Sequence, residues 1–79
     1  MNDIEDRLKT IFHDHMGVER ESITDVTRLV DDIGMDSLDA VELLIAVEEE
    51  FYTEIPQSEW DAATTFRDVR KCVEANLNG

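Results

Sequence analysis

Apolar side chains recur at helical spacing near the beginning of the chain. This pattern predicts a helix over residues 3–16, whose inward face consists of Ile4, Leu8, Ile11, Phe12 and His15. Gly17 is a natural end for that helix, because glycine readily adopts the left-handed backbone conformation that closes many helices. The next segment of about 20 residues has no regular period, so we expect a long loop. Its apolar anchors are Val18, Ile23, Val26, Leu29, Val30 and Ile33.

A second helical period begins in the middle of the chain. It predicts a helix over residues 36–52, with a core face formed by Ala40, Leu43, Leu44, Val47 and Phe51. Asp36 is expected to cap this helix, because its carboxylate can accept backbone N–H groups of the first turn. Asp39 adds a negative charge near the electropositive end of the helix dipole.

The same helix carries a second apolar stripe, about a third of a turn from the first. Its apolar members are Leu38, Val41 and Ile45, and the acids beside it are Glu42, Glu48 and Glu49. A small core cannot bury both faces, so this stripe is predicted to be a docking surface, where apolar residues give contact area and charges orient a basic partner. We expect the long loop to cover Leu38 and Val41 in part and to leave Ile45 exposed.

A short third helix is predicted after a turn at residues 53–57. Ser58 and Asp61 have the spacing of a capping pair, which favours a helix over residues 58–63. Its sequence includes Trp60, a large aromatic residue in a short element.

The last helix is predicted by a repeat of the same capping pattern. Thr65 and Asp68 stand at its start, and it should end near residues 76–79. Its inward stripe is Phe66, Val69, Val73 and Leu77. With no repeat and no strand pattern, the fold class is predicted to be all-α. We expect one domain over residues 1–79, a small four-helix bundle with a long loop between the first two helices and a short third helix.

Charge is distributed unevenly along the chain. The 79 residues include 20 acids and 7 bases, for a formal net charge of -13. No Lys or Arg occurs between Leu29 and Phe66, whereas that stretch contains Asp31, Asp32, Asp36, Asp39, Glu42, Glu48, Glu49, Glu50, Glu54, Glu59 and Asp61. Such a surface should repel nucleic acid and anionic lipid and attract basic protein patches.

Membrane insertion is not expected. The longest apolar run, Leu43–Val47, is far too short to span a bilayer, and the first residues are acidic where a signal peptide would be basic. Cys72 is the only cysteine, so the chain can form neither an internal disulfide nor a cysteine metal cluster. We therefore expect a cytoplasmic monomer in which Cys72 is a small buried hydrophobic residue.

Ser37 is a poor candidate for a catalytic nucleophile. Such a serine requires a base within hydrogen-bond reach and an oxyanion site, and the G-x-S-x-G elbow is absent. His13 and His15 stand two apart on one helix and therefore face different directions. Metal binding is also disfavoured, because the segment around Ile33 departs from the calcium-loop pattern at that position.

The segment GMDSLDAVELLIAVEEEFYTEIP, residues 34–56, resembles the central region of acyl carrier proteins, with Ser37 in the D-S-L position. The resemblance covers most of the chain, because the amphipathic first helix, the loop VERESITDVTRLVDDIG and the TTF start of the last helix also occupy the expected places. It implies that a phosphopantetheinyl transferase moves 4'-phosphopantetheine from coenzyme A onto the Ser37 hydroxyl. The terminal thiol of that arm would then carry acyl groups as thioesters.

The resemblance also implies a partner surface on the second helix. Its residues would be Asp36, Leu38, Asp39, Val41, Glu42, Ile45, Glu48 and Glu49. The partners would be the transferase, acyltransferases, ketosynthases and other biosynthetic enzymes with basic docking patches. The negative surface and the helix start are compatible with both roles.

Three alternatives remain for the pathway and function. GMDSLD resembles acyl carriers more than the G-G-x-S pattern of peptidyl carriers, which favours fatty acid or polyketide assembly. SEWD resembles the third-helix start of some D-alanyl carriers, so an aminoacyl or lipid-modifying carrier is an alternative. Trp60 and Phe66 are large enough to fill space that a long acyl chain would need, whereas Ala63 removes volume nearby. The rings are the larger change, so we expect a short or polar acyl group, or one left in solvent. From a different class, an acidic helical interaction module without a prosthetic group would explain the charge alone.

Overall fold

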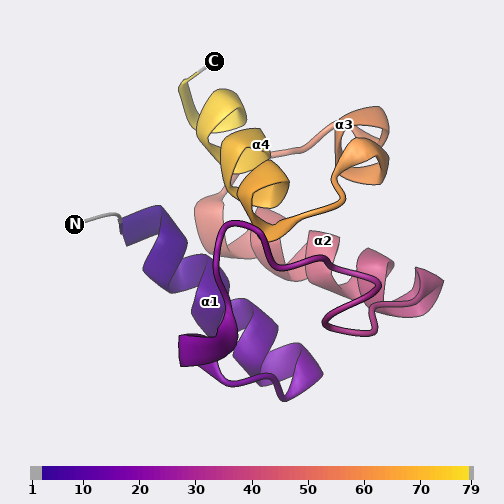
Figure 1. Ribbon diagram of the computed structural model, residues 1–79. Helices are drawn as coiled ribbons and strands as arrows, with labels where there is room; N and C mark the ends of the chain where they lie inside the picture. The colour runs from indigo at the N-terminus through magenta and orange to yellow at the C-terminus, as the bar shows by residue number, and fades with distance from the viewer. Residues whose placement is uncertain (1–2, 79) are drawn as a thin grey trace.

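The computed structural model describes residues 3–78 and is all-helical over that range (Figure 1). The elements are α1 (Asp3–Met16), the 3-10 helix η1 (Arg20–Ser22), α2 (Ser37–Phe51), α3 (Gln57–Ala62) and α4 (Phe66–Asn78). The predicted four-helix bundle with a long loop and a short third helix is confirmed. Among the described residues the only β contact is an isolated bridge between Arg28 and Thr65.

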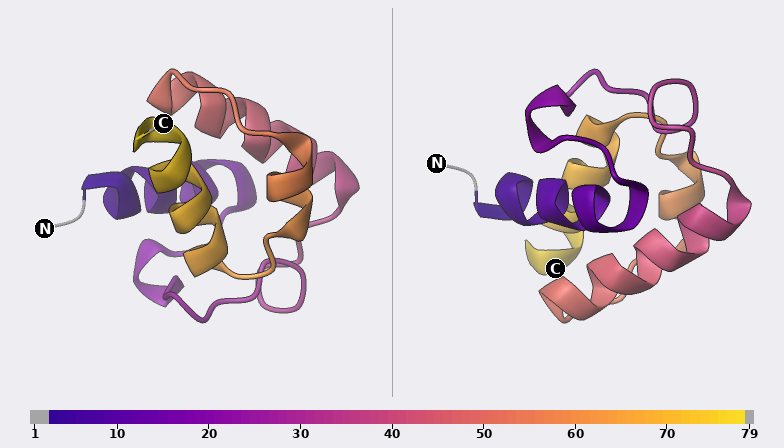
Figure 2. Two further views of the ribbon diagram at one scale, coloured as in Figure 1. Left: turned by 90° about the horizontal axis from the view of Figure 1, so that it is seen from above. Right: turned by 90° about the horizontal axis from the view of Figure 1, so that it is seen from below.

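One core joins the four helices. α1 packs against both α2 and α4, and α3 packs against α4 (Figure 2). At the centre, Phe12 of α1 and Phe66 of α4 meet edge to face, with ring centroids 5.8 Å apart. The buried apolar residues are Leu8, Ile11, Phe12, Ile23, Leu29, Leu43, Val47, Phe51, Ile55, Trp60, Phe66, Val69, Cys72 and Val73. Cys72 is therefore buried as predicted.

The ends of α1 and α2 follow from local backbone chemistry. Gly17 ends α1 with φ +73°, and its N–H donates to the carbonyl of His13 at 2.9 Å. α2 ends at Tyr52, whose backbone is left-handed, with φ 51°. The structure therefore places both ends within one residue of the predicted positions.

The long loop is held by fewer apolar residues than predicted. Ile23 and Leu29 are buried, but Val26 and Val30 are exposed and do not anchor it. Backbone hydrogen bonds replace them: Leu29 N–H donates to the carbonyl of Thr64 at 3.0 Å, and Phe66 N–H donates to that of Thr27 at 2.9 Å. The loop is thereby fixed to the α3–α4 connection.

Two predicted core positions are wrong. His15 is exposed, because the last turn of α1 directs Met16 toward the core instead. Leu77 is also exposed, at 42%, since the final turn of α4 lies at the upper edge of the bundle (Figure 1). Within the core face of α2, Leu43, Val47 and Phe51 are buried, while Ala40 and Leu44 are half-buried.

Of the capping predictions for α3 and α4, the one for α4 is confirmed and the one for α3 is wrong. Thr65 N–H donates to Asp68 Oδ2 at 3.1 Å and Asp68 N–H to Thr65 Oγ1 at 3.3 Å, which confirms the cap of α4. Ser58 does not cap α3. That helix begins one residue earlier than predicted, directly after Pro56, and Asp61 instead accepts a hydrogen bond from Gln57 Nε2 at 2.8 Å.

No helix in residues 3–78 is long and apolar enough to cross a membrane.

Candidate functional site

A tight turn precedes α2 and leaves the start of the helix exposed to solvent. Arg28 N–H donates to Asp32 Oδ2 at 2.8 Å, and Met35 N–H donates to the carbonyl of Leu29 at 3.0 Å. Gly34 has φ +83°, a conformation that favours glycine because it has no Cβ. The chain can therefore reverse within a few residues and enter the helix at Ser37.

Asp36 and Asp39 close the first turn of α2 by a reciprocal cap. Asp39 N–H donates to Asp36 Oδ1 at 2.8 Å, and Asp36 N–H donates to Asp39 Oδ2 at 3.2 Å. The backbone N–H of Asp39 is the main cause that lowers the pKa of Asp36, since it stabilises the charged carboxylate. The predicted cap is confirmed. Asp39 was expected to contribute only its negative charge, but its carboxylate also accepts a hydrogen bond from Asp36 N–H.

Ser37 is the first residue of α2, and its side chain is exposed. Within residues 3–78 no group forms a hydrogen bond with its hydroxyl, and the helix is capped by the preceding residue, Asp36. Beside it lies a surface hollow lined by Val30, Met35 and Ala40. An accessible, unengaged hydroxyl next to an apolar hollow fits a covalently attached, flexible group.

Within residues 3–78, Ser37 has no hydrogen-bonded base. Neither histidine hydrogen bonds to Ser37, and His13 Nδ1 instead lies 2.8 Å from the carbonyl oxygen of Val18. The described part of the chain also contains no group of three or more metal-ligating side chains.

The second apolar stripe of α2 is more open than predicted. Leu38 is 66% exposed, Val41 53% and Ile45 50%. The expected partial cover of Leu38 and Val41 is wrong. The η1 part of the long loop lies on one side of α1 and α2 lies on the opposite side, so this part of the loop cannot cover the stripe (Figure 2). We call these three residues the α2 strip. All of it is accessible to a partner.

The acids beside the α2 strip have different environments. Glu42 and Glu49 are exposed, whereas Glu48 is half-buried and its Oε2 accepts the N–H of Ile55 at 2.9 Å. Glu48 therefore holds the α2–α3 connection in place in addition to supplying charge. Sequence reasoning missed that role, because the contact joins residues seven positions apart across an irregular turn.

Trp60 connects α3 to α2. Its side chain is 4% exposed, and its indole N–H donates to the carbonyl of Ala40 at 3.1 Å. Phe66, the other predicted cargo determinant, faces Phe12 of α1 instead. The two rings thus occupy different parts of the core, and Trp60 alone lies between α3 and the segment that carries Ser37.

Most acids of the base-free stretch lack an ion pair in the described structure. Of the eleven acids, Asp31, Asp32 and Glu50 pair with arginines. The other eight have no cation within salt-bridge distance among residues 3–78, so their mutual repulsion opposes the compact state. Glu42 and Glu49 are the exposed members of this group beside the α2 strip.

Salt should therefore stabilise the protein. We expect Tm to rise by about 4–8 °C between low ionic strength and either 0.3 M NaCl or millimolar MgCl2, which corresponds to about 1 kcal/mol in a domain of this size. Circular dichroism melts measure it. The variant Glu42→Gln, Glu49→Gln should have a higher Tm than the wild type in low salt, and its Tm should rise less when salt is added. A flat or falling Tm in both salts would show that the acids are already compensated.

Residues 6–73 match the family model described as a phosphopantetheine attachment site. The match covers most of the chain, and the all-helical fold is consistent with a carrier domain. The chain therefore belongs to the phosphopantetheine attachment family and is consistent with an acyl carrier protein. It is a carrier rather than a catalyst, and its prosthetic group is covalently bound 4'-phosphopantetheine.

Proposed function

We propose that this protein is an acyl carrier whose 4'-phosphopantetheine is attached to Ser37. The observation that carries the proposal is the exposed hydroxyl of Ser37 at the first position of α2, free of hydrogen bonds within residues 3–78. In the transfer, Ser37 Oγ attacks the phosphorus of coenzyme A that carries the pantetheine, the pyrophosphate bond breaks, and adenosine 3',5'-bisphosphate leaves. Ser37 Oγ thereby becomes an ester oxygen of the phosphodiester, and its proton passes to the phosphopantetheinyl transferase. The arm supplies a terminal thiol that holds an acyl group as a thioester.

The chain's own residues prepare Ser37 for this reaction. Asp36 and Asp39 fix the first helical turn, so the serine is presented in one backbone conformation. Gly34 allows the turn that keeps the loop clear of it. The positive end of the helix dipole is a favourable place for a phosphodiester charge.

The partner surface of this function lies on α2. It comprises the α2 strip together with Asp36, Asp39, Glu42, Glu48 and Glu49, of which Glu42 and Glu49 are the exposed steering charges. The transferase, acyltransferases and ketosynthases would dock there through basic patches. Apolar contact gives affinity, and the acids raise the association rate.

The cargo is a short or polar acyl group. Trp60 supports this part, because its indole lies between α3 and α2 and is hydrogen bonded to Ala40. A long chain could enter that space only by displacing a buried aromatic ring. Fatty acid or polyketide assembly with short intermediates fits, and the same observation favours an aminoacyl or lipid-modifying carrier as the second candidate.

Intact mass spectrometry tests the attachment. The apo protein, incubated with coenzyme A, Mg2+ and a broad-specificity phosphopantetheinyl transferase, should gain the mass of one arm. Ser37→Ala should gain nothing. Ser58→Ala, an exposed serine at the start of α3, is the matched control and should be modified like the wild type. Labelling of the Ser37→Ala variant, or no labelling of folded wild type, would refute the proposal.

A further inference from the structure

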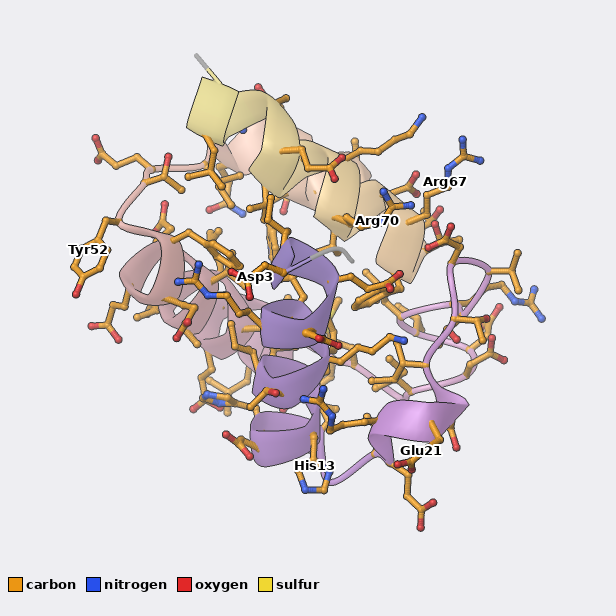
Figure 3. All side chains as sticks on the ribbon, turned by 90° about the vertical axis from the view of Figure 1, so that its left-hand side faces the viewer. Asp3, His13, Glu21, Tyr52, Arg67 and Arg70 are labelled. Carbon is orange, nitrogen blue, oxygen red and sulfur yellow. The ribbon has the colours of Figure 1, made fainter. Side chains whose placement is uncertain are left out.

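Tyr52 occupies a position that neither its backbone nor its packing explains. Its φ of 51° lies in the left-handed region, where a residue with a Cβ is strained and glycine or asparagine is usual. Its side chain is 94% exposed and projects from the end of α2 into solvent (Figure 3). A tyrosine here costs stability and gains no core contact. A strained backbone at an exposed residue indicates a role in binding rather than in folding.

Tyr52 extends the α2 strip. It directly follows Phe51, the last residue of α2, and therefore lies at the end of the helix that carries the α2 strip. The exposed apolar series is then Leu38, Val41, Ile45 and Tyr52. It begins beside Ser37 and runs the full length of the helix, about 22 Å.

The surroundings of Tyr52 suit a guanidinium group. A shallow surface hollow is lined by Glu48, Tyr52, Thr53 and Glu54. Glu48 is held in place by the N–H of Ile55, and no base occurs between Leu29 and Phe66. An aromatic ring beside carboxylates attracts a cation through the ring face and through charge.

The same combination already binds an arginine inside this molecule. The guanidinium carbon of Arg7 lies 4.4 Å from the ring centroid of Phe51, and Arg7 Nε donates to Glu50 Oε2 at 2.7 Å. Phe51 is buried and Glu50 is exposed, and both contact Arg7 of α1. Tyr52 offers an equivalent ring on the outer side, and within residues 3–78 no arginine ring contact with it occurs.

The geometry points to a second docking contact, in which Tyr52, with Glu48 and Glu54, receives an arginine side chain of the phosphopantetheinyl transferase that modifies Ser37. The inference rests on the proposed function of Ser37. A protein interface of standard size covers about 800 Å2 per partner, a patch about 30 Å across. An enzyme seated over Ser37 and the α2 strip therefore reaches Tyr52.

Steady-state transfer kinetics, with coenzyme A and the same broad-specificity transferase, test this contact. Tyr52→Gly should raise the KM for the carrier about three- to fivefold with kcat unchanged, since a surface cation–ring contact is lost. The same variant should raise Tm by a few degrees, because glycine relieves the left-handed strain. Tyr52→Phe restores the ring and should recover most of the lost affinity.

A structural role for Tyr52 would make the Tyr52→Gly variant less stable as well as a poorer substrate. The docking contact instead predicts a poorer substrate, with a higher KM, that is more stable, with a higher Tm. Val26→Ser changes an exposed apolar residue in the long loop and should leave KM and Tm as in the wild type. If Tyr52→Gly keeps the wild-type KM while Ser37 is still modified, the docking contact is wrong and the proposed function stands. If wild-type Ser37 accepts no arm, the proposed function itself fails.

Discussion

Replacing Trp60 by alanine should lower the free energy of unfolding by about 3–5 kcal/mol, the usual cost of removing a buried aromatic side chain. The indole is 4% exposed and donates to the carbonyl of Ala40, so the variant loses both the packing and the link between α3 and α2. A domain of this length has a total stability of about 4–12 kcal/mol. The loss would therefore remove a large part of it.

Urea unfolding followed by far-ultraviolet circular dichroism measures this effect without relying on tryptophan fluorescence. Trp60→Phe keeps most of the ring volume and loses the N–H donor, and should cost about 1 kcal/mol or slightly more. It remains measurable if Trp60→Ala does not fold. Leu38→Ala, an exposed position, is the control and should change stability by less than about 0.5 kcal/mol. A Trp60→Ala variant as stable as the control would show that the indole contributes little.

The same residue sets the expectation for cargo. If the indole fills the space between α2 and α3, then octanoyl and acetyl forms of the modified protein should have nearly equal Tm values and similar amide shifts at Leu43, Val47 and Val69, three core positions. Large shifts at these amides in the octanoyl form, together with a higher Tm, would mean that a long chain enters the core. That result would contradict the proposed short or polar cargo.

Reversing the exposed acids of α2 should slow modification by the transferase strongly. For Glu42→Lys, Glu49→Lys we expect kcat/KM to fall at least about tenfold at low ionic strength, because the variant replaces attraction of a basic partner by repulsion. The difference should shrink at 0.3 M NaCl, where exposed charges are screened. Glu48 is left unchanged, since it holds Ile55 and its loss would alter the α2–α3 connection.

A matched pair of substitutions controls for net charge. Glu19→Lys, Glu21→Lys makes the same charge change at exposed positions at η1, which lies on the opposite side of α1 from α2 (Figure 2). It should keep kcat/KM within about twofold of the wild type, since steering depends mainly on charges near the docking surface. Equal slowing in both pairs would show that total charge, rather than the face of α2, governs the encounter. Wild-type rates in the α2 pair would exclude steering there altogether.

The sequence by itself determined the helices and the candidate serine. The periods of apolar residues and the capping patterns join residues three or four positions apart, so the hydrogen bonds that they predict form within a single turn. Asp36 and Asp39 are an example, and Thr65 with Asp68 is another. The position of Ser37 at the start of α2 follows from the same local chemistry.

The tertiary structure decided which surfaces are free. Two apolar faces of α2 had similar patterns, and the packing of α1 selected Leu43, Val47 and Phe51 for the core while leaving the α2 strip open. Contacts between distant residues then assigned Glu48 to Ile55 and Trp60 to Ala40. Local patterns cannot determine such choices, because burial depends on which elements meet in space, and that is fixed by the packing of the whole chain.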